Sequence, residues 1–296
     1  MRQSSPLRLG AVTTALITPF RGEAVDLTAL ESLAIRQIQS GIGGIAVCTV
    51  TGEGPTLSML ERSAVLQCCV RAADRRVPIV AATGTNCTLE TIRLTQQAEA
   101  LGADAAIVTV PYYSKPGQRG ILHHFEALAT ETSIPLIVDD NPARSASCLS
   151  PRTLEALASI PSIIGVIGHG MLPPPPALRE RFLFLSDSDD TSLAFLSGYG
   201  TGIISSGANV HPRLFNSLHN AALAGNIPGA LALERRLHTV MQILGDQAPA
   251  QIKYALRLLL DIDPTVRLPM VELDTEEKAA VFEALTSTAE THPLAS

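Results

Sequence analysis

The chain has 296 residues, of which 46% are hydrophobic and 17% charged, enough apolar material for a large buried core. Its net charge of −6 and its low aromatic content, 4% with no tryptophan, argue against binding to nucleic acid or to an anionic membrane surface. No stretch approaches the roughly 20 apolar residues of a membrane span, and the first residues lack the apolar core of a signal peptide, so we expect a cytoplasmic protein.

Short apolar runs rich in β-branched residues alternate with longer amphipathic stretches, which is typical of βα units with a parallel sheet. Eight runs are predicted to be strands: residues 11–18, 44–48, 78–83, 105–110, 135–138, 163–166, 182–185 and 202–205. Eight parallel strands with helices between them favour a closed barrel over an open sheet. We therefore predict an α/β fold, a (β/α)8 TIM barrel, over residues 1–225.

Helices are predicted from apolar spacing and from capping residues. Asp26 precedes one helix as a good N-cap, Ser58 and Glu61 form a capping-box pattern, and Gly102 suits a left-handed helix end. The predicted helices cover residues 28–40, 58–73, 88–101, 120–131, 151–159, 191–197 and 212–224. Four consecutive prolines at 173–176 predict a stiff extended segment and leave room only for a short helix after them. Patterns at 228–244, 249–260 and 275–285 have no strand partner and predict a C-terminal helical extension over residues 226–296.

In such barrels the active site lies at the C-terminal ends of the strands, so the residues that end each strand are the candidate functional residues. After the second strand, hydroxyls at Thr49 and Thr51 accompany small residues whose backbone N–H groups can hold a carboxylate, although a plain turn explains them as well. Arg144, after the fifth strand, can clamp a carboxylate through two parallel hydrogen bonds or can form a surface ion pair.

Carboxylates and an imidazole follow the fifth, sixth and seventh strands. Adjacent residues on a strand point to opposite faces, so Asp139 and Asp140 cannot both face the barrel interior. Asp139, His169 and Asp189 can converge at one rim as ligands of a divalent metal, but helix capping explains aspartates at these positions equally well. We expect no metal and no other cofactor.

Taken in order, these motifs resemble those of the dihydrodipicolinate synthases and N-acetylneuraminate lyases, a family of pyruvate-dependent class I aldolases. The resemblance runs from about residue 11 to about residue 285, and the double tyrosine and the arginine after the fifth strand make the synthase branch the closer one. It rests on Ala15-Leu16-Ile17-Thr18-Pro19-Phe20, Thr51-Gly52-Glu53, Gly84-Thr85-Asn86, Val110-Pro111-Tyr112-Tyr113-Ser114-Lys115-Pro116, Pro142-Ala143-Arg144, Ser188-Asp189-Asp190, Ala208-Asn209-Val210 and Arg267-Leu268-Pro269-Met270.

The resemblance implies roles for single residues. Thr51 matches the threonine that binds the carboxylate of pyruvate, and Arg144 matches the arginine that grips the carboxylate of the second substrate. Tyr113 matches a tyrosine that reaches across a dimer into the proton relay of the neighbour, and Tyr112 matches one that packs in that interface. The implied partners are a small carboxylate or keto acid and further copies of the chain, as a dimer or a tetramer.

Other positions of the resemblance are less complete. Val50 and Ile204 fall at substrate-binding positions of the family. Asn86 and Glu90 match part of the site at which lysine inhibits some synthases, but the other residues of that site differ here.

Three catalytic positions depart from the family. Ile167 stands where the family has the lysine of its Schiff base, Asp139 replaces the catalytic tyrosine, and Val50 replaces the threonine of the proton relay. A Schiff base requires an amine. The chain has only three lysines, Lys115, Lys253 and Lys278. We expect none of them at a strand end facing the cavity, nor in the desolvated environment that lowers the pKa of a catalytic amine.

Three functions therefore stay open. The first is a synthase-like protein that has lost Schiff-base chemistry and binds a small keto acid or carboxylate. The second is an active lyase or aldolase in which Asp139 is the base and His169 or a metal is the electrophile. The third is a non-enzymatic sensor or regulatory homologue that keeps Thr51 and Arg144 for binding.

Overall fold

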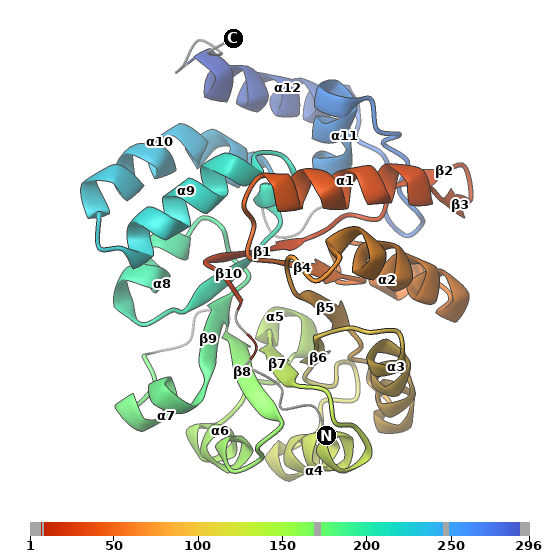
Figure 1. The fold of residues 1–296 in the computed structure, drawn as a ribbon, viewed down its shortest axis with the longest axis vertical. Helices are drawn as coiled ribbons and strands as arrows, with labels where there is room; N and C mark the ends of the chain where they lie inside the picture. The colour runs from red at the N-terminus through yellow and green to blue at the C-terminus, as the bar shows by residue number, and fades with distance from the viewer. Residues whose placement is uncertain (1–6, 8, 169–172, 245–248, 291–296) are drawn as a thin grey trace.

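A computed structural model describes residues 7, 9–168, 173–244 and 249–290. Eight parallel strands close into a barrel in the order β1-β10-β9-β8-β7-β6-β5-β4 (Figure 1). They are β1 (Val12–Ala15), β4 (Gly44–Val47), β5 (Ile79–Ala82), β6 (Ala105–Thr109), β7 (Leu136–Asp140), β8 (Ile163–Gly168), β9 (Leu183–Ser186) and β10 (Gly202–Ser205). Each lies within or overlaps one of the eight predicted runs, and the (β/α)8 barrel is confirmed.

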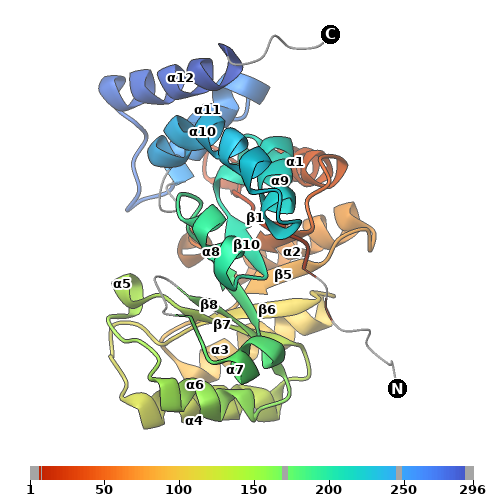
Figure 2. The same cartoon turned by 90° about the vertical axis from the view of Figure 1, so that its left-hand side faces the viewer.

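Helices surround the barrel, as Figures 1 and 2 show. They are α1 (Leu27–Gln39), α2 (Met59–Ala73), α3 (Thr88–Ala100), α4 (Gln118–Glu131), α6 (Pro151–Ala158), α7 (Pro176–Arg181), α8 (Ser192–Gly198) and α9 (Pro212–Leu223). The predicted caps are present: the Asp26 side chain accepts a hydrogen bond from the N–H of Ala29, and Ser58 and Glu61 form a capping box. Gly102 has a φ of 93°, the left-handed conformation expected after α3.

The first strand is shorter than predicted. It ends at Ala15 because the backbone N–H of Ile17 donates to Oδ1 of Asn209, 3.1 Å away, instead of to a neighbouring strand. The chain then forms a small antiparallel ribbon, β2 (Phe20–Arg21) and β3 (Ala24–Val25), which the sequence did not predict. Three short turns of helix were also missed: η1 (Gly54–Thr56), α5 (Pro142–Ser145) and η2 (Gly207–Asn209).

The C-terminal helices α10 (Ile227–Ile243), α11 (Pro249–Leu260) and α12 (Thr275–Glu290) follow the last strand. Figures 1 and 2 place α12 at the end of the molecule opposite α4 and α6. Ile252 and Leu256 of α11 share a hydrophobic cluster with Leu30 of α1 and Val65 of α2. The extension thus shares a hydrophobic core with helices α1 and α2 of the barrel.

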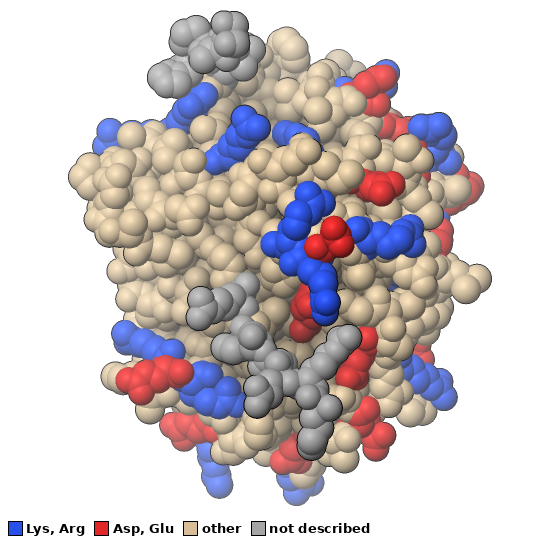
Figure 3. Space-filling model, viewed as in Figure 1, with Lys and Arg blue, Asp and Glu red and all other residues tan. Residues whose placement is uncertain are grey.

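The barrel interior is filled by its own apolar cluster. Its members come from all eight strands of the barrel: Ala15, Ala46, Val80, Ala105, Ile107, Ile137, Ile167, Leu185 and Ile204. On the face seen in Figure 3, acidic and basic side chains lie close to one another, and the area over α8 and α9 carries few charges. No helix in the described ranges combines the length and the apolar composition that a membrane crossing requires.

Candidate functional site

A cavity of about 520 Å³ lies at the C-terminal ends of the strands. Its inner end is hydrocarbon: Ala15, Ile107, Ile167 and Ile204 all line it, and each is at most 5% exposed. Ionisable side chains line it further out, from the ends of β7 and β9 and from α2, α3 and α5. This is the end of the barrel at which the sequence predicted the site.

Among the ionisable residues that line the cavity, Asp139 lies on a barrel strand, β7. It lies next to Thr109 of β6 and Ile167 of β8 in the parallel register. Burial, and then the nearby carboxylate of Asp187, raise the pKa of Asp139 to about 7, against the opposing effects of Arg144 and of a hydrogen bond with Thr109. A carboxyl group with this pKa exchanges a proton readily near neutral pH, which suits a general acid or base.

Two further charged groups line the cavity beside Asp139. Asp187 follows β9, is 8% exposed, and accepts a hydrogen bond of 3.4 Å from Nδ2 of Asn141. Arg144 lies on α5, a single turn that begins with Pro142 directly after β7. The short helix therefore places the guanidinium of Arg144 in the cavity lining, close to β7, which carries Asp139.

The segment after β4 supplies a second wall. Thr49 and Val50 line the cavity, whereas Thr51 is fully buried beside them, and its Oγ1 has no hydrogen-bond partner within the described residues. The turn is tight, because a Cβ atom on Gly54 would lie 1.9 Å from the carbonyl oxygen of Cys48. Glycine at this position is what permits the chain to double back into η1.

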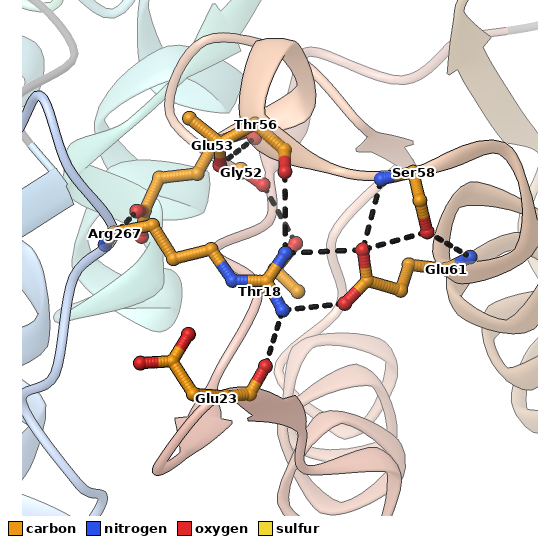
Figure 4. Close-up of polar contacts among 8 residues, drawn as sticks. All are labelled: Thr18, Glu23, Gly52, Glu53, Thr56, Ser58, Glu61 and Arg267. Carbon is orange, nitrogen blue, oxygen red and sulfur yellow. Dashed lines mark hydrogen bonds and ion pairs between the residues drawn. The ribbon is translucent and has the colours of Figure 1, made fainter.

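The C-terminal extension holds this turn from outside the cavity. Arg267 donates from its backbone N–H to Oε2 of Glu53 at 2.8 Å, and its guanidinium contacts Glu61 and the carbonyl oxygens of Glu23 and Thr56 (Figure 4). The contact with Arg267 is the main reason why the pKa of Glu61 falls to about 2. One side chain thus ties the extension to the β2–β3 ribbon, to η1 and to the capping box of α2.

Lys253 of α11 completes the same network and corrects a prediction. Its Nζ lies 2.5 Å from Oε1 of Glu53, donates to the carbonyl oxygen of Thr265 at 2.7 Å, and stands 4.0 Å from the centre of the Phe20 ring. The side chain is fully buried, and burial lowers its pKa to about 8 against the opposing effect of Glu53. The expectation that none of the lysines is desolvated was therefore wrong for Lys253. This lysine does not line the cavity.

The structure separates the carboxylates that the sequence grouped. Asp189 is turned away from the cavity lining: it accepts from the backbone N–H of Gly207 at 2.8 Å and from the Ser206 hydroxyl at 3.3 Å. The predicted convergence of Asp139 with Asp189 was thus wrong, and Asp187 takes that place. His169 lies outside the described residues, and within them no group of three or more potential ligands can hold a metal ion.

Some of the other predicted residues line the cavity, and others do not. Val50, Arg144 and Ile204 line the cavity, as does Tyr112. Tyr113 has a φ of 66°, is 89% exposed, and points away from the lining of its own chain. The sequence missed Arg62 and Thr109 as lining residues. Thr109 could have been found from strand alternation with Ile107, whereas nothing in the helical pattern of α2 distinguishes Arg62.

These observations define a (β/α)8 barrel with a ligand-sized cavity at the C-terminal ends of its strands. The model of the Dihydrodipicolinate synthetase family matches residues 8–288. The chain belongs to this family, as its sequence motifs indicated.

Similar proteins cover nearly the whole chain. The 4-hydroxy-tetrahydrodipicolinate synthase of Ehrlichia canis (strain Jake) is 39% identical over 285 residues, covering 94% of this chain and 96% of that protein. The enzyme of the same name from Roseobacter denitrificans is 40% identical over 273 residues, covering 90% and 94%. A solved dihydrodipicolinate synthase from Acinetobacter baumannii in complex with pyruvate matches with a TM-score of 0.91 and 33% identity, covering 95% of this chain and 99% of that one.

Proposed function

We propose that this chain is a lyase or aldolase for a small keto acid or carboxylate, in which Asp139 moves the proton and no lysine forms an imine. Relatives at 36–40% identity are named as synthases, which favours an active enzyme over a silent homologue. The single observation that carries the mechanism is the pair formed by Asp139, with a pKa of about 7, and its strand neighbour Ile167 on the same cavity wall.

The lysines support the part of the proposal that excludes an imine. The sequence offers Lys115, Lys253 and Lys278 only. Lys115 is exposed, Lys253 is held in its ion pair with Glu53, and Lys278 lies on α12 near the ring of Tyr254. None of the three lines the cavity. A carbonyl group bound beside Asp139 therefore meets the isoleucine side chain at 167 and no amine.

The proposed step is a proton transfer followed by formation of a carbon–carbon bond. The Asp139 carboxylate removes a proton from the carbon next to the keto group, and the electron pair of the C–H bond becomes the C=C bond of an enolate. The enolate carbon attacks the carbonyl carbon of a second substrate, and the resulting alkoxide takes the proton back from Asp139. The guanidinium groups of Arg62 and Arg144, both in the cavity lining, supply positive charge for the enolate oxygen and the substrate carboxylate.

The roles of the remaining residues belong to the same proposal. Val50 and Thr51 shape the carboxylate end of the site, and Ile204 binds substrate as part of the apolar inner end. The exposed Tyr113 enters the cavity of a neighbouring copy in a homo-oligomer. Sedimentation velocity tests this association: the proposal predicts a dimer or a tetramer, whereas one solved relative, 28% identical, is a monomeric dihydrodipicolinate synthase variant.

Exchange of the C3 hydrogens of pyruvate with deuterium, followed by NMR, tests the proton transfer without knowledge of the second substrate. The wild-type protein should catalyse exchange, and Asp139→Asn should abolish it. Asp140→Asn is the matched control, because Asp140 is the next residue of β7, is buried, and does not line the cavity. Binding of pyruvate without any exchange in the wild type would refute catalysis and favour the ligand-binding homologue instead.

A further inference from the structure

The inner end of the cavity is apolar on every side that the strands provide. Ala15 comes from β1, Ile107 from β6, Ile167 from β8 and Ile204 from β10, and all four also belong to the cluster that fills the barrel interior. They are 3–5% exposed, so a small part of each contributes to a hydrocarbon floor. A polar group of a ligand placed against this floor has no partner to replace its water.

The floor residue Ile167 lies at the same level along the barrel strands as Asp139. Asp139 pairs with Ile167 in the register of β7 and β8, and neighbouring strands lie about 4.8 Å apart. Ile107 lies two residues before Thr109, which pairs with Asp139, and so stands one layer deeper. A substrate whose reacting carbon is beside Asp139 therefore extends its next atoms over Ile167 and Ile107.

The cavity has room for a second substrate and for a keto acid longer than three carbons. Cavities of roughly 300–1,000 Å³ bury most of the surface of drug-sized ligands, and this one measures about 520 Å³. Its charged lining groups Asp187 and Arg144 lie beyond the strand ends, whereas Asp139, on β7, borders the floor beside Ile167. A keto acid bound here can thus place its carboxylate towards Arg144 and its hydrocarbon on the floor.

We infer that the preferred substrate is a 2-oxo acid, or a related carboxylate, with an aliphatic chain that packs on Ile107, Ile167 and Ile204. This inference rests on the proposed function, since it names the substrate class of the same site. The carboxylate points to Arg144, the keto group lies beside Asp139, and the chain lies on the floor. Each methylene moved from water to the floor tightens binding roughly threefold to fourfold.

Isothermal titration calorimetry with pyruvate, 2-oxobutanoate, 2-oxopentanoate and 2-oxohexanoate tests this inference. The dissociation constant should fall at each step, by roughly thirtyfold or more over the series. Ile167→Thr keeps the branching at Cβ but adds a hydroxyl to the floor, so the dependence on chain length should flatten. Ile137→Val is the matched control, because Ile137 belongs to the same interior cluster and does not line the cavity; its chain-length dependence should equal that of the wild type.

Calorimetry separates this inference from the proposed function, because it measures binding without turnover. Affinity that stays constant or falls from pyruvate to 2-oxohexanoate would overturn the apolar substrate class, even if pyruvate exchanges its hydrogens. Affinity that rises with chain length would support it, even if no exchange is detected and the proposed catalysis fails. A rising affinity that is unchanged in Ile167→Thr would also overturn it, since the chain would then bind elsewhere.

Discussion

Nζ of Lys253 lies 2.5 Å from Oε1 of Glu53, and both side chains are shielded from solvent, at 0% and 1% exposure. The pair joins α11 of the C-terminal extension to the turn that follows β4, two residues after Thr51. Since the turn supplies Thr49 and Val50 to the cavity, the extension stabilises one wall of the site.

Lys253→Met should lower the free energy of unfolding by about 3–5 kcal/mol, because it leaves the Glu53 carboxylate buried without its cation. Urea denaturation measures this loss. The double variant Lys253→Met with Glu53→Gln should recover part of it, and Lys278→Met, on α12, should change stability by less than about 1 kcal/mol. Equal losses in Lys253→Met and Lys278→Met would show that the buried pair has no special weight.

Glu61 should make the protein sensitive to acid. Its contact with Arg267 lowers its pKa from 4.5 to about 2, so its contribution to stability is present above pH 4.5 and is lost as the pH falls towards 2. Glu61→Gln should therefore unfold with a smaller change in stability over that range than the wild type. Thermal unfolding at a series of pH values measures the difference, and parallel curves for the two proteins would contradict it.

Asp139 should change the pH dependence of stability in the opposite direction. Its pKa is raised from 3.8 to about 7, so its contribution to stability is present below pH 3.8 and is lost as the pH rises through about 7. Asp139→Asn removes the cost of burying this charge and should raise the free energy of unfolding at about pH 8 by about 1–3 kcal/mol, with little gain at about pH 4. Chemical denaturation at the two pH values is the measurement, and a variant that is less stable at the higher pH would be inconsistent with the raised pKa.

The turn after β4 should not tolerate a side chain at Gly54. Gly54→Ala places a methyl group 1.9 Å from the Cys48 carbonyl oxygen, and backbone has to move to relieve it. We expect a loss of stability above about 2 kcal/mol and weaker binding of keto acids by calorimetry. Gly22→Ala, at the exposed turn of the β2–β3 ribbon, is the control with open space around its Cβ. Gly22→Ala should lose only the stability that alanine costs at a φ of 59°, and it should leave the binding of keto acids unchanged.

The strands, most helices and the position of the site could be predicted from the sequence, because apolar periodicity and caps are local signals. Local signals did not reveal that Asn209, far along the chain, ends β1 at Ala15. They also did not distinguish Asp187 from Asp189, which are two residues apart but differ in whether they reach the cavity or the turn before Gly207. Lys253 is buried because α11 packs against the barrel, and the helical pattern of the sequence does not predict this packing.

The central claim is that carbon acid chemistry at Asp139 proceeds here without an imine. Borohydride reduction of the protein in the presence of pyruvate, followed by intact-mass and peptide mass spectrometry, tests it most directly. The wild-type protein should show no pyruvyl adduct, while Ile167→Lys, which places an amine beside Asp139, should form one at residue 167. A stable adduct on Lys115, Lys253 or Lys278 of the wild-type protein would contradict the claim.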